Sequence, residues 1–181
     1  DARVLYPGSY VDIAPSDWFD DVTTVDTDKR AAKYFELGAA VGQLVDSKRQ
    51  AVDQPTGAAT MVFHHLDYRT PLPFEEESFD LLVSLYAGFI SEHCTRYLRV
   101  GGTLFVNPSH GDAAMASIDP RYELTGVVTS GQRGYRVSTD GLETYLVPKK
   151  VQRITVDSLH ESGRGIGYTR SPYAYLFTRR R

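Results

Sequence analysis

The chain has 181 residues, of which 41% are hydrophobic and 24% are charged, and its formal net charge at pH 7 is −3. This length fits a single domain with a sizeable core, and the slightly acidic balance gives no general attraction to nucleic acid. The single cysteine, Cys94, excludes an internal disulfide. No apolar run approaches the roughly 20 residues of a membrane-spanning helix, and no signal segment is recognisable, so we expect a cytoplasmic protein without membrane contact.

Strands and helices alternate along the first two thirds of the sequence. β-branched and apolar runs predict strands at 3–6, 22–25, 59–64, 79–85 and 103–106. Apolar residues at helical spacing predict helices at 28–45, 90–98 and 111–118, and Gly101-Gly102 is expected to stop the second of them. Such alternation is typical of βαβ units in a parallel sheet.

The rest of the chain is richer in strands. The runs 122–128 and 173–178 predict strands, 155–161 predicts a short helix, and 136–147, with Asp140-Gly141 at its centre, is typical of a hairpin. We expect antiparallel strands at one edge of the sheet, within one domain spanning residues 1–181. Because the first strand begins by Val4 with no helix before it, we expect an N-terminal helix of a longer protein to lie outside this chain.

Basic and aromatic residues alternate in the segment 129–153, which we expect to be a hairpin insert. Interleaving of this kind can indicate contact with nucleic acid, but basic side chains are also typical of edge strands that must not pair further. We favour the edge strand and do not expect a nucleic-acid partner. The residues concerned are Arg133, Tyr135, Arg136, Tyr145, Lys149, Lys150 and Arg153.

Three residues with binding chemistry follow successive predicted strands. Gly8 lies in a turn after the first strand, Asp26 ends the second, and Asp67 follows the third. A glycine turn lets the backbone approach a ligand closely, and an acid at the end of the second strand can accept hydrogen bonds from ribose hydroxyls. Since parallel strands end at one edge of the sheet, these residues predict a cradle for an adenosine-containing cofactor.

Several stretches resemble the class I S-adenosylmethionine (SAM)-dependent methyltransferases. They are VLYPGS at 4–9, VD at 25–26, LPFEEESFDLLV at 72–83 and YLRVGGTL at 97–104, in the order typical of that family. The resemblance implies an α/β, three-layer Rossmann-like sandwich with a mostly parallel, seven-stranded sheet and antiparallel C-terminal strands. It also implies SAM as cofactor and methyl transfer to an acceptor, which we expect to be a small molecule.

The same resemblance assigns places to individual residues. Gly8, Ser9 and Tyr10 would line the methionine part of SAM, and Asp26 with Thr27 would hold the ribose. Asp67 and Tyr68 would flank the adenine, whereas Ser84 and Tyr86 would face the transferable methyl group. Tyr6, Tyr10, Tyr68 and Tyr86 would then gather near one pocket, either as an aromatic wall around a flat or cationic ligand or as simple filling.

The glycine turn departs from the family pattern. Tyr6 stands where an acid is expected, and Tyr10 and Asp12 stand where further glycines are expected. Asp12 is the candidate to replace the lost charge. The departures favour an alternative in which the chain is a non-catalytic binding or oligomerisation module. A nicotinamide-dependent oxidoreductase is a third hypothesis, weakened because no Gly-x-Gly-x-x-Gly follows the first strand.

Catalytic residues are harder to assign. Transfer of a methyl group depends chiefly on holding donor and acceptor in line, and a base is needed only where the acceptor must lose a proton. His110, after the fifth strand, and Tyr86 are the candidates, although an exposed loop histidine often has no role. No metal is expected, because His64 and His65 are neighbours on a strand and point to opposite faces.

Overall fold

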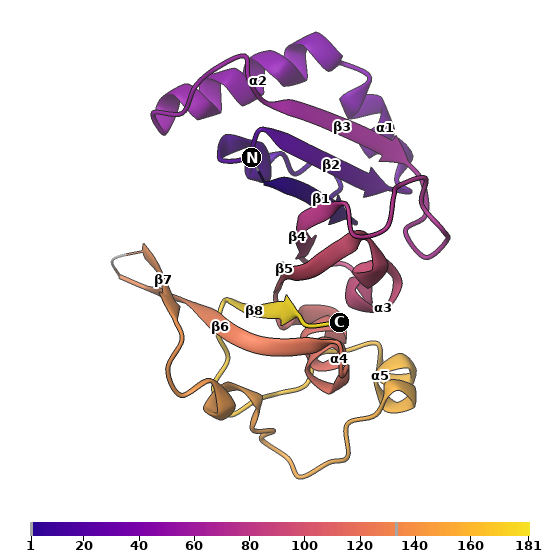
Figure 1. The fold of residues 1–181 in the computed structure, drawn as a ribbon, viewed down its shortest axis with the longest axis vertical. Coiled ribbons are helices and arrows are strands. Elements are labelled where there is room, and N and C mark those ends of the chain that lie inside the picture. Colours follow the sequence, from indigo (N-terminus) through magenta and orange to yellow (C-terminus); the bar gives the residue numbers. More distant parts are fainter. Residues whose placement is uncertain (1, 133) are drawn as a thin grey trace.

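The computed structural model describes residues 2–132 and 134–181, which form one mixed sheet with helices beside it (Figure 1). The strands run in the order β3-β2-β1-β4-β5-β8-β6-β7 across the sheet. In chain order they are β1 (Arg3–Pro7), β2 (Asp21–Asp26), β3 (Thr60–His65), β4 (Phe79–Ser84), β5 (Leu98–Val106), β6 (Tyr122–Gly131), β7 (Gly134–Ser138) and β8 (Ala174–Arg179). The helices are α1 (Lys29–Phe35), α2 (Gly38–Ala51), α3 (Ile90–Cys94), α4 (Asp112–Ile118) and α5 (Val156–Ser162), with 3₁₀ turns η1 (Ala14–Asp17), η2 (Thr95–Tyr97), η3 (Ser109–Gly111) and η4 (Leu142–Leu146).

The sheet is parallel from β3 to β5 and antiparallel beyond it. β1 lies in the middle of the parallel part, where Val4 pairs with Val22 of β2 and with Leu81 of β4. β8 pairs antiparallel with β5 and β6, and β6 pairs antiparallel with β7. This arrangement confirms the Rossmann-like α/β expectation, but the described residues form eight strands, one more than expected, because β7 joins the same sheet.

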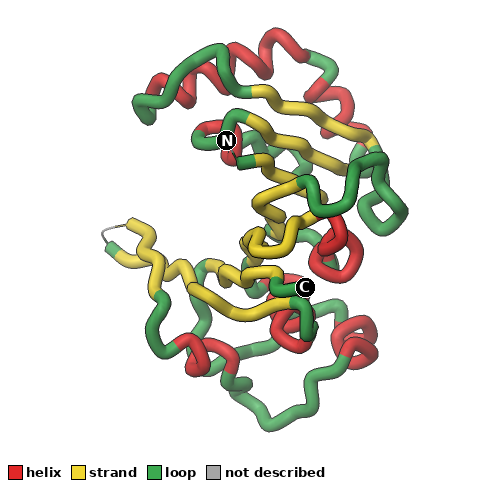
Figure 2. The backbone as a smooth tube through the Cα atoms, viewed as in Figure 1, coloured by secondary structure: helices red, strands yellow, loops and turns green. Residues whose placement is uncertain are grey.

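The position of the hairpin was predicted wrongly. β6 and β7 turn between Gly131 and Gly134, which pair with each other, whereas Asp140-Gly141 leads into η4. Gly141 has φ +60° and begins that 3₁₀ turn, so the Asp-Gly pair starts a helical turn instead of closing a strand pair. β7 is the edge strand that we expected from the basic residues, and Arg133 lies outside the described residues. Figure 2 shows that the chain between β7 and β8 is mostly loop.

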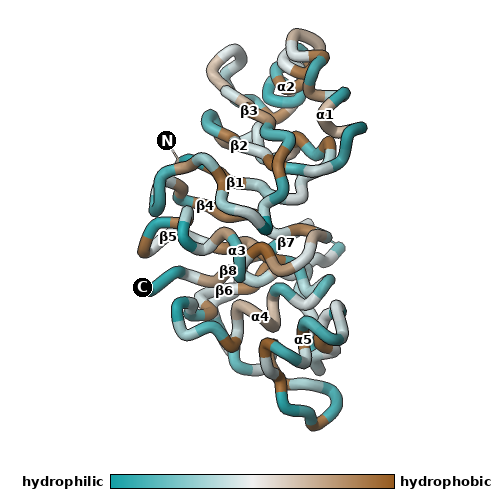
Figure 3. The backbone as a smooth tube through the Cα atoms, turned by 90° about the vertical axis from the view of Figure 1, so that its right-hand side faces the viewer, coloured by the Kyte–Doolittle hydropathy of each residue, from teal (hydrophilic) through white to brown (hydrophobic). Residues whose placement is uncertain are grey.

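Two hydrophobic layers cover the sheet, as a three-layer sandwich requires. On one face Leu5, Leu82 and Leu104 pack in a core together with the side chains of α3, α4 and α5. On the other face Val4 and its neighbours form a smaller core, and residues near η1 pack with α2 beside β3. Figure 3 shows that the backbone of α4 has a hydrophobic colour, consistent with four consecutive buried residues at 113–116.

Glycines account for two further differences from the expected elements. The helix expected at 28–45 is divided into α1 and α2, which are separated just before Gly38. Gly101 and Gly102 lie inside β5 and do not end a helix, since α3 stops at Cys94. A Cβ on Gly102 would lie 3.0 Å from the carbonyl oxygen of Asp80, so the glycine permits the close approach of β4 at an irregularity of the ladder. Among the described residues, no helix has the length and hydropathy to span a membrane.

Candidate functional site

The glycine turn after β1 is fixed to the end of β2. Gly8 has φ +67°, which favours glycine, and its N–H donates to the carbonyl oxygen of Val25 at 2.7 Å. The N–H of Tyr10 donates to Asp26 Oδ2 at 2.7 Å. The structure therefore brings the predicted turn and the predicted ribose-binding acid together. The Tyr10 ring is half-exposed, and the guanidinium carbon of Arg30 lies over it, 5.4 Å from the ring centre.

Asp26 keeps part of its accepting capacity. Its Oδ1 accepts a hydrogen bond from the N–H of Asp28 at 2.8 Å, so each carboxylate oxygen has one backbone donor and one further lone pair. Thr27, the next residue, is exposed, and its carbonyl oxygen accepts from His65 Nε2 at 2.9 Å. The ends of β2 and β3 are thus held in register beside the turn.

Ser9 is buried in the glycine turn without a partner. Its side chain is 3% exposed, and among the described residues its Oγ has no hydrogen-bond partner. Leaving a buried hydroxyl unsatisfied costs about 1–3 kcal/mol, so such a group calls for an explanation. A polar ligand atom at this turn would satisfy the hydroxyl, which agrees with the place that the resemblance implies for Ser9.

The turn also touches the loop after β4. A Cβ on Gly8 would lie 2.5 Å from the Cβ of Ala87 and 3.9 Å from the ring of Tyr68. Tyr68 in turn approaches Gly88, whose Cβ would lie 2.9 Å from the phenol oxygen. Burial raises the pKa of Tyr68, which therefore stays a neutral phenol. Gly8 and Tyr68 are brought together as expected, with the β4 loop closing the space between them.

Asp67 is occupied by its own turn. Its Oδ1 accepts from the N–H and Nε of Arg69, at 2.9 Å each, and its Oδ2 lies 2.7 Å from Arg69 Nη2. These bonds lower the pKa of the carboxyl group. An adenine amino group would have to share this acceptor with the guanidinium.

Ser84 does not face the expected methyl position. It is 2% exposed, and its Oγ donates to Asp112 Oδ2 at 2.5 Å, on the face of the sheet that α4 covers. Residues two apart on a strand point to the same face of the sheet. Leu82 and its partner on β1, Leu5, belong to the core on the α4 side, so Ser84 points to that side as well. The hydroxyl is directed into the interior, and only Tyr86 of this pair is exposed at the carboxyl edge.

Tyrosines gather around Asp12 at the same edge. The Tyr6 hydroxyl donates to Asp12 Oδ2 at 3.0 Å, and burial together with this carboxylate raises the pKa of Tyr6. The phenols of Tyr86 and Tyr173 lie near enough to raise the pKa of Tyr6 further, and the Tyr173 ring is 4.7 Å from that of Tyr135. The aromatic wall thus contains Tyr6 and Tyr86 of the expected set, whereas Tyr10 and Tyr68 lie apart from it.

His110 lies in the loop after β5 with a left-handed backbone. Its φ is +56°, its side chain is exposed, and its Nδ1 is 3.0 Å from Ser109 Oγ. Ser109 donates to Asn107 Oδ1 at 2.6 Å, and the same oxygen accepts a long bond of 3.4 Å from the N–H of Tyr86. His110 and Tyr86, the two catalytic candidates, are therefore linked by hydrogen bonds through Ser109 and Asn107. Asn107 was not among the residues expected from the sequence.

His64 and His65 have different surroundings. The His64 ring packs edge-on against Phe74 at 5.0 Å, and burial lowers its pKa, whereas His65 binds the carbonyl oxygen of Thr27. Within residues 2–132 and 134–181 no three His, Cys, Asp or Glu side chains are grouped to hold a metal ion. A groove of about 560 Å³ between α1, α2 and the outer strand β3 has His65 in its lining.

Asp112 is the functional candidate that the sequence reasoning missed. It is 1% exposed at the start of α4, and burial raises its pKa to about 6 although three hydrogen bonds from Ser84 and Ser91 oppose the shift. The sequence held no signal for this burial, because an acid in the first turn of a helix is ordinarily an exposed N-terminal residue.

Known structures share this architecture. An rRNA methylase from Streptococcus thermophilus aligns with 100% of this chain and 89% of its own, with 10% identical residues and a TM-score of 0.51. The chain therefore has a Rossmann-like methyltransferase fold. A SAM-dependent methyltransferase from Methanosarcina mazei aligns with 99% of the chain and 93% of its own, at 12% identity and a TM-score of 0.45.

Other similar structures with this methyltransferase fold are larger. The [4+2]-cyclase SpnF aligns with 59% of this chain at 15% identity and a TM-score of 0.41. The chain spans 38% of SpnF and 49% of a methyltransferase from Bacillus halodurans, less than half of either. No protein-family model matches the sequence, and no curated protein sequence does so at a significant level.

Proposed function

We propose that the chain binds SAM at the carboxyl edge of β1, β2 and β4 and transfers its methyl group to a small-molecule acceptor. The observation that carries the proposal is the buried, partnerless hydroxyl of Ser9 in a glycine turn bonded to Asp26. A turn that served only to reverse the chain would have no reason to bury an unsatisfied hydroxyl. Both residues stand where a methyltransferase fold would receive the cofactor.

The residues present fit this cofactor in kind. Asp26 has a free lone pair on each oxygen for the two ribose hydroxyls, and Ser9 and the backbone of the turn would hold the methionine part. Asp12 replaces the missing acid of the turn and would attract the ammonium group, with Tyr6 fixing its orientation. SAM supplies a methyl group on a sulfonium, which is already activated for displacement.

The acceptor side is formed by the tyrosines around Asp12. Tyr86 and Tyr135 are 67% and 64% exposed, so their rings are available to an incoming molecule. Phenol rings beside a carboxylate favour a flat or cationic acceptor and disfavour a phosphate-bearing one. We therefore propose a small, uncharged or cationic acceptor, held in line with the methyl group by ring contacts, and His110 as the base where the acceptor must lose a proton.

A non-catalytic binding module is the second candidate. It is favoured by the contact between Gly8 and Ala87, which leaves no room for even one additional carbon at that point. If the loop after β4 stays in this position, the methionine part of a cofactor has little space. The chain would then keep the fold as a scaffold without methyl transfer.

Calorimetric titration separates these functions. We expect binding of SAM and of its demethylated product S-adenosylhomocysteine (SAH), and none of NAD. Asp26→Ala should weaken SAH binding at least tenfold, because two hydrogen bonds to a charged acceptor are lost. Asp28→Asn is the matched control two residues away, since Asp28 caps α1 and is not in the proposed site. No SAM or SAH binding at millimolar concentration would favour the non-catalytic module.

A further inference from the structure

One buried carboxylate holds both ends of the loop after β4. Asp112 Oδ2 accepts from Ser84 Oγ, the last residue of β4, at 2.5 Å. Its Oδ1 accepts from Ser91 Oγ at 2.5 Å and from the Ser91 N–H at 3.1 Å, in the first turn of α3. The residues between these anchors, 85–90, form the connection that ends the strand and begins the helix.

The anchored loop is the segment that closes on the proposed cofactor site. Ala87 contacts the glycine turn at Gly8, and Gly88 contacts the phenol of Tyr68. Tyr86, just before them, faces solvent and has φ +56°, a backbone conformation that non-glycine residues adopt only when their surroundings hold it. A change in the anchors of this loop would therefore reach the turn that carries Ser9.

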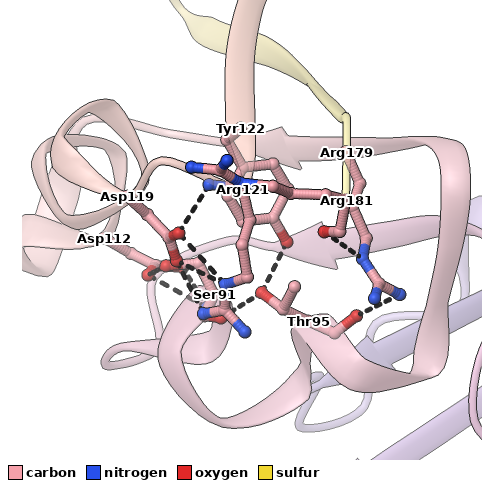
Figure 4. A network of polar contacts seen from close by, with 8 residues as sticks. All are labelled: Ser91, Thr95, Asp112, Asp119, Arg121, Tyr122, Arg179 and Arg181. Carbon is pink, nitrogen blue, oxygen red and sulfur yellow. Dashed lines mark hydrogen bonds and ion pairs between the residues drawn. The ribbon is translucent and has the colours of Figure 1, made fainter.

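The network continues away from the loop into the sheet. Figure 4 shows Asp112, Ser91, Thr95 and Tyr122 joined by hydrogen bonds, with the Asp119–Arg121 ion pair beside them. Thr95 Oγ1 donates to the carbonyl oxygen of Ser91 and lies 2.7 Å from the phenol oxygen of Tyr122 on β6. The first turn of α3 is thus fixed from two directions, and the Arg179 guanidinium donates to the carbonyl oxygen of Thr95 at its end.

Stability alone does not account for a charge at this place. A fully buried carboxylate is unfavourable unless compensated, and all its partners here are neutral hydroxyl and amide groups. An asparagine of the same shape would avoid the buried charge, but its amide nitrogen could not accept a hydrogen bond from a serine. A costly ionisable group beside a binding site is a common sign of a functional requirement.

We propose that Asp112 is a positioning residue, whose carboxylate holds the 85–90 loop against the glycine turn in the arrangement that binds the cofactor. This inference rests on the proposed SAM site and adds the residue that controls its closure. Substitution of the carboxylate removes an acceptor from one or both serine anchors. The loop then opens and cofactor affinity falls.

Burial raises the pKa of Asp112 to about 6, so the closed loop binds a proton more tightly than an open loop with a hydrated carboxyl group, and protonation favours closure. The titratable groups that face it are Tyr68 from the loop after β3, Cys94 on α3 and Tyr122 on β6. Burial raises the pKa of each, that of Cys94 to about 12, so all three remain neutral near pH 6. His160 also contacts this loop, its ring 5.0 Å from that of Phe89, so the comparison with Asp112→Asn decides whether a pH effect on the loop belongs to Asp112.

The test compares Asp112→Asn with Asp119→Asn in the full chain, by SAH titration from pH 5 to 8 and by amide hydrogen exchange. The wild type should bind SAH at least as tightly at pH 5 as at pH 7.5, because protonation of Asp112 favours the closed loop. Asp112→Asn should bind about tenfold more weakly at pH 7.5, with little dependence on pH, and exchange of 85–90 should accelerate while β1 and β4 stay protected. Asp119→Asn, at the other end of α4, should keep the wild-type affinity and pH profile.

Two results would overturn the inference. One is an Asp112→Asn protein whose SAH affinity and pH profile match the wild type; the other is unchanged exchange of 85–90. Ser91→Ala, which removes one anchor without touching the charge, gives a milder opening of the same loop if Asp112→Asn fails to fold. If the wild type binds no SAH, the proposed function fails, while the exchange experiment still decides whether Asp112 holds the loop.

Discussion

The phenol of Tyr6 donates a hydrogen bond to Asp12, whose Oδ2 lies 3.0 Å away, across the glycine turn. Tyr6 stands where the methyltransferase pattern has an acid. The carboxylate of Asp12, six residues further along the chain, lies next to this position through the hydrogen bond. Asp12 Oδ1 also accepts from the N–H of Ala14 at 2.9 Å, which orients the carboxylate. Under the proposed function, the carboxylate of Asp12 supplies the negative charge that Tyr6 does not.

Asp12→Asn should therefore weaken SAH binding about tenfold and leave adenosine binding unchanged, because adenosine lacks the ammonium group that the carboxylate attracts. Tyr6→Phe should have a smaller effect, since it removes only the orienting hydroxyl. Competition titrations with SAH and adenosine measure both. Equal losses for the two ligands would show that Asp12 supports the turn and does not contact the ammonium group.

Ser9→Ala should separate binding from stability. The substitution removes a buried hydroxyl without a partner, so the free energy of unfolding should stay equal or rise by about 1 kcal/mol. SAH affinity should fall several-fold, because the ligand loses a hydrogen bond. Ser16→Ala is the control: that buried hydroxyl donates to the carbonyl oxygen of Ile13 at 2.6 Å, so its loss should lower stability by about 1 kcal/mol and leave affinity unchanged. Reduced stability of Ser9→Ala would contradict the assignment.

The close contact at Gly8 predicts a large cost for any side chain. Gly8→Ala combines a left-handed backbone with a 2.5 Å approach to Ala87, and urea unfolding should show a loss of about 2 kcal/mol or more. Gly57→Ala is matched in backbone, with φ +73°, but its Cβ would meet nothing within 4 Å. It should cost about 1 kcal/mol. Similar losses in the two variants would mean that the contact with Ala87 yields easily.

Asp112 should give stability an unusual dependence on pH. The pKa of Asp112 in the folded state, about 6, lies above the ordinary value of 3.8, so the folded state binds the proton more tightly than the unfolded state. The contribution of Asp112 to the free energy of unfolding therefore falls as pH rises from about 4 to 7. Asp112→Asn should gain stability relative to the wild type over that range, by up to about 3 kcal/mol. Denaturant unfolding at several pH values measures the difference.

Asp119→Asn should show the opposite sign. Burial opposes the shift, but hydrogen bonds from Arg121 lower the pKa of Asp119, so its contribution is present above the ordinary pKa and is lost in acid. The variant should therefore be less stable than the wild type at pH 7 and should approach it at low pH. If the stabilities of the two variants, relative to the wild type, changed with pH in the same direction, Asp112 would be hydrated and not buried.

The sequence predicted the features that depend on local patterns and chain order. Apolar runs located the parallel strands, and the turn at Gly8 and the acid at Asp26 met because parallel strands end at one edge. The prediction failed where tertiary contacts decide. Ser84 turned inward because a strand residue shares a face with its alternate neighbours, and Asp112 became visible only when α4 proved to be buried.

Other misses have equally specific causes. Asp140-Gly141 has the composition of a hairpin turn, but it leads into a 3₁₀ turn, and the hairpin closes at glycines seven to ten residues earlier. The sequence also gave no sign that Arg49 is buried. Its guanidinium binds Asp20 at 2.6 Å and the carbonyl oxygen of Ser16 at 2.9 Å, a set of partners from a segment 29 to 33 residues away.

The most direct test of the cofactor site is a crystal structure of the protein grown with SAH. The account predicts density for the nucleoside at the carboxyl edge of β1 and β2, with the ribose hydroxyls on Asp26 and a polar atom of the ligand within hydrogen-bond distance of Ser9 Oγ. The loop at 85–90 should lie over the ligand, with Ser84 and Ser91 still bonded to Asp112. Density for SAH at another place, or an 85–90 loop released from Asp112 at saturating SAH, would contradict it.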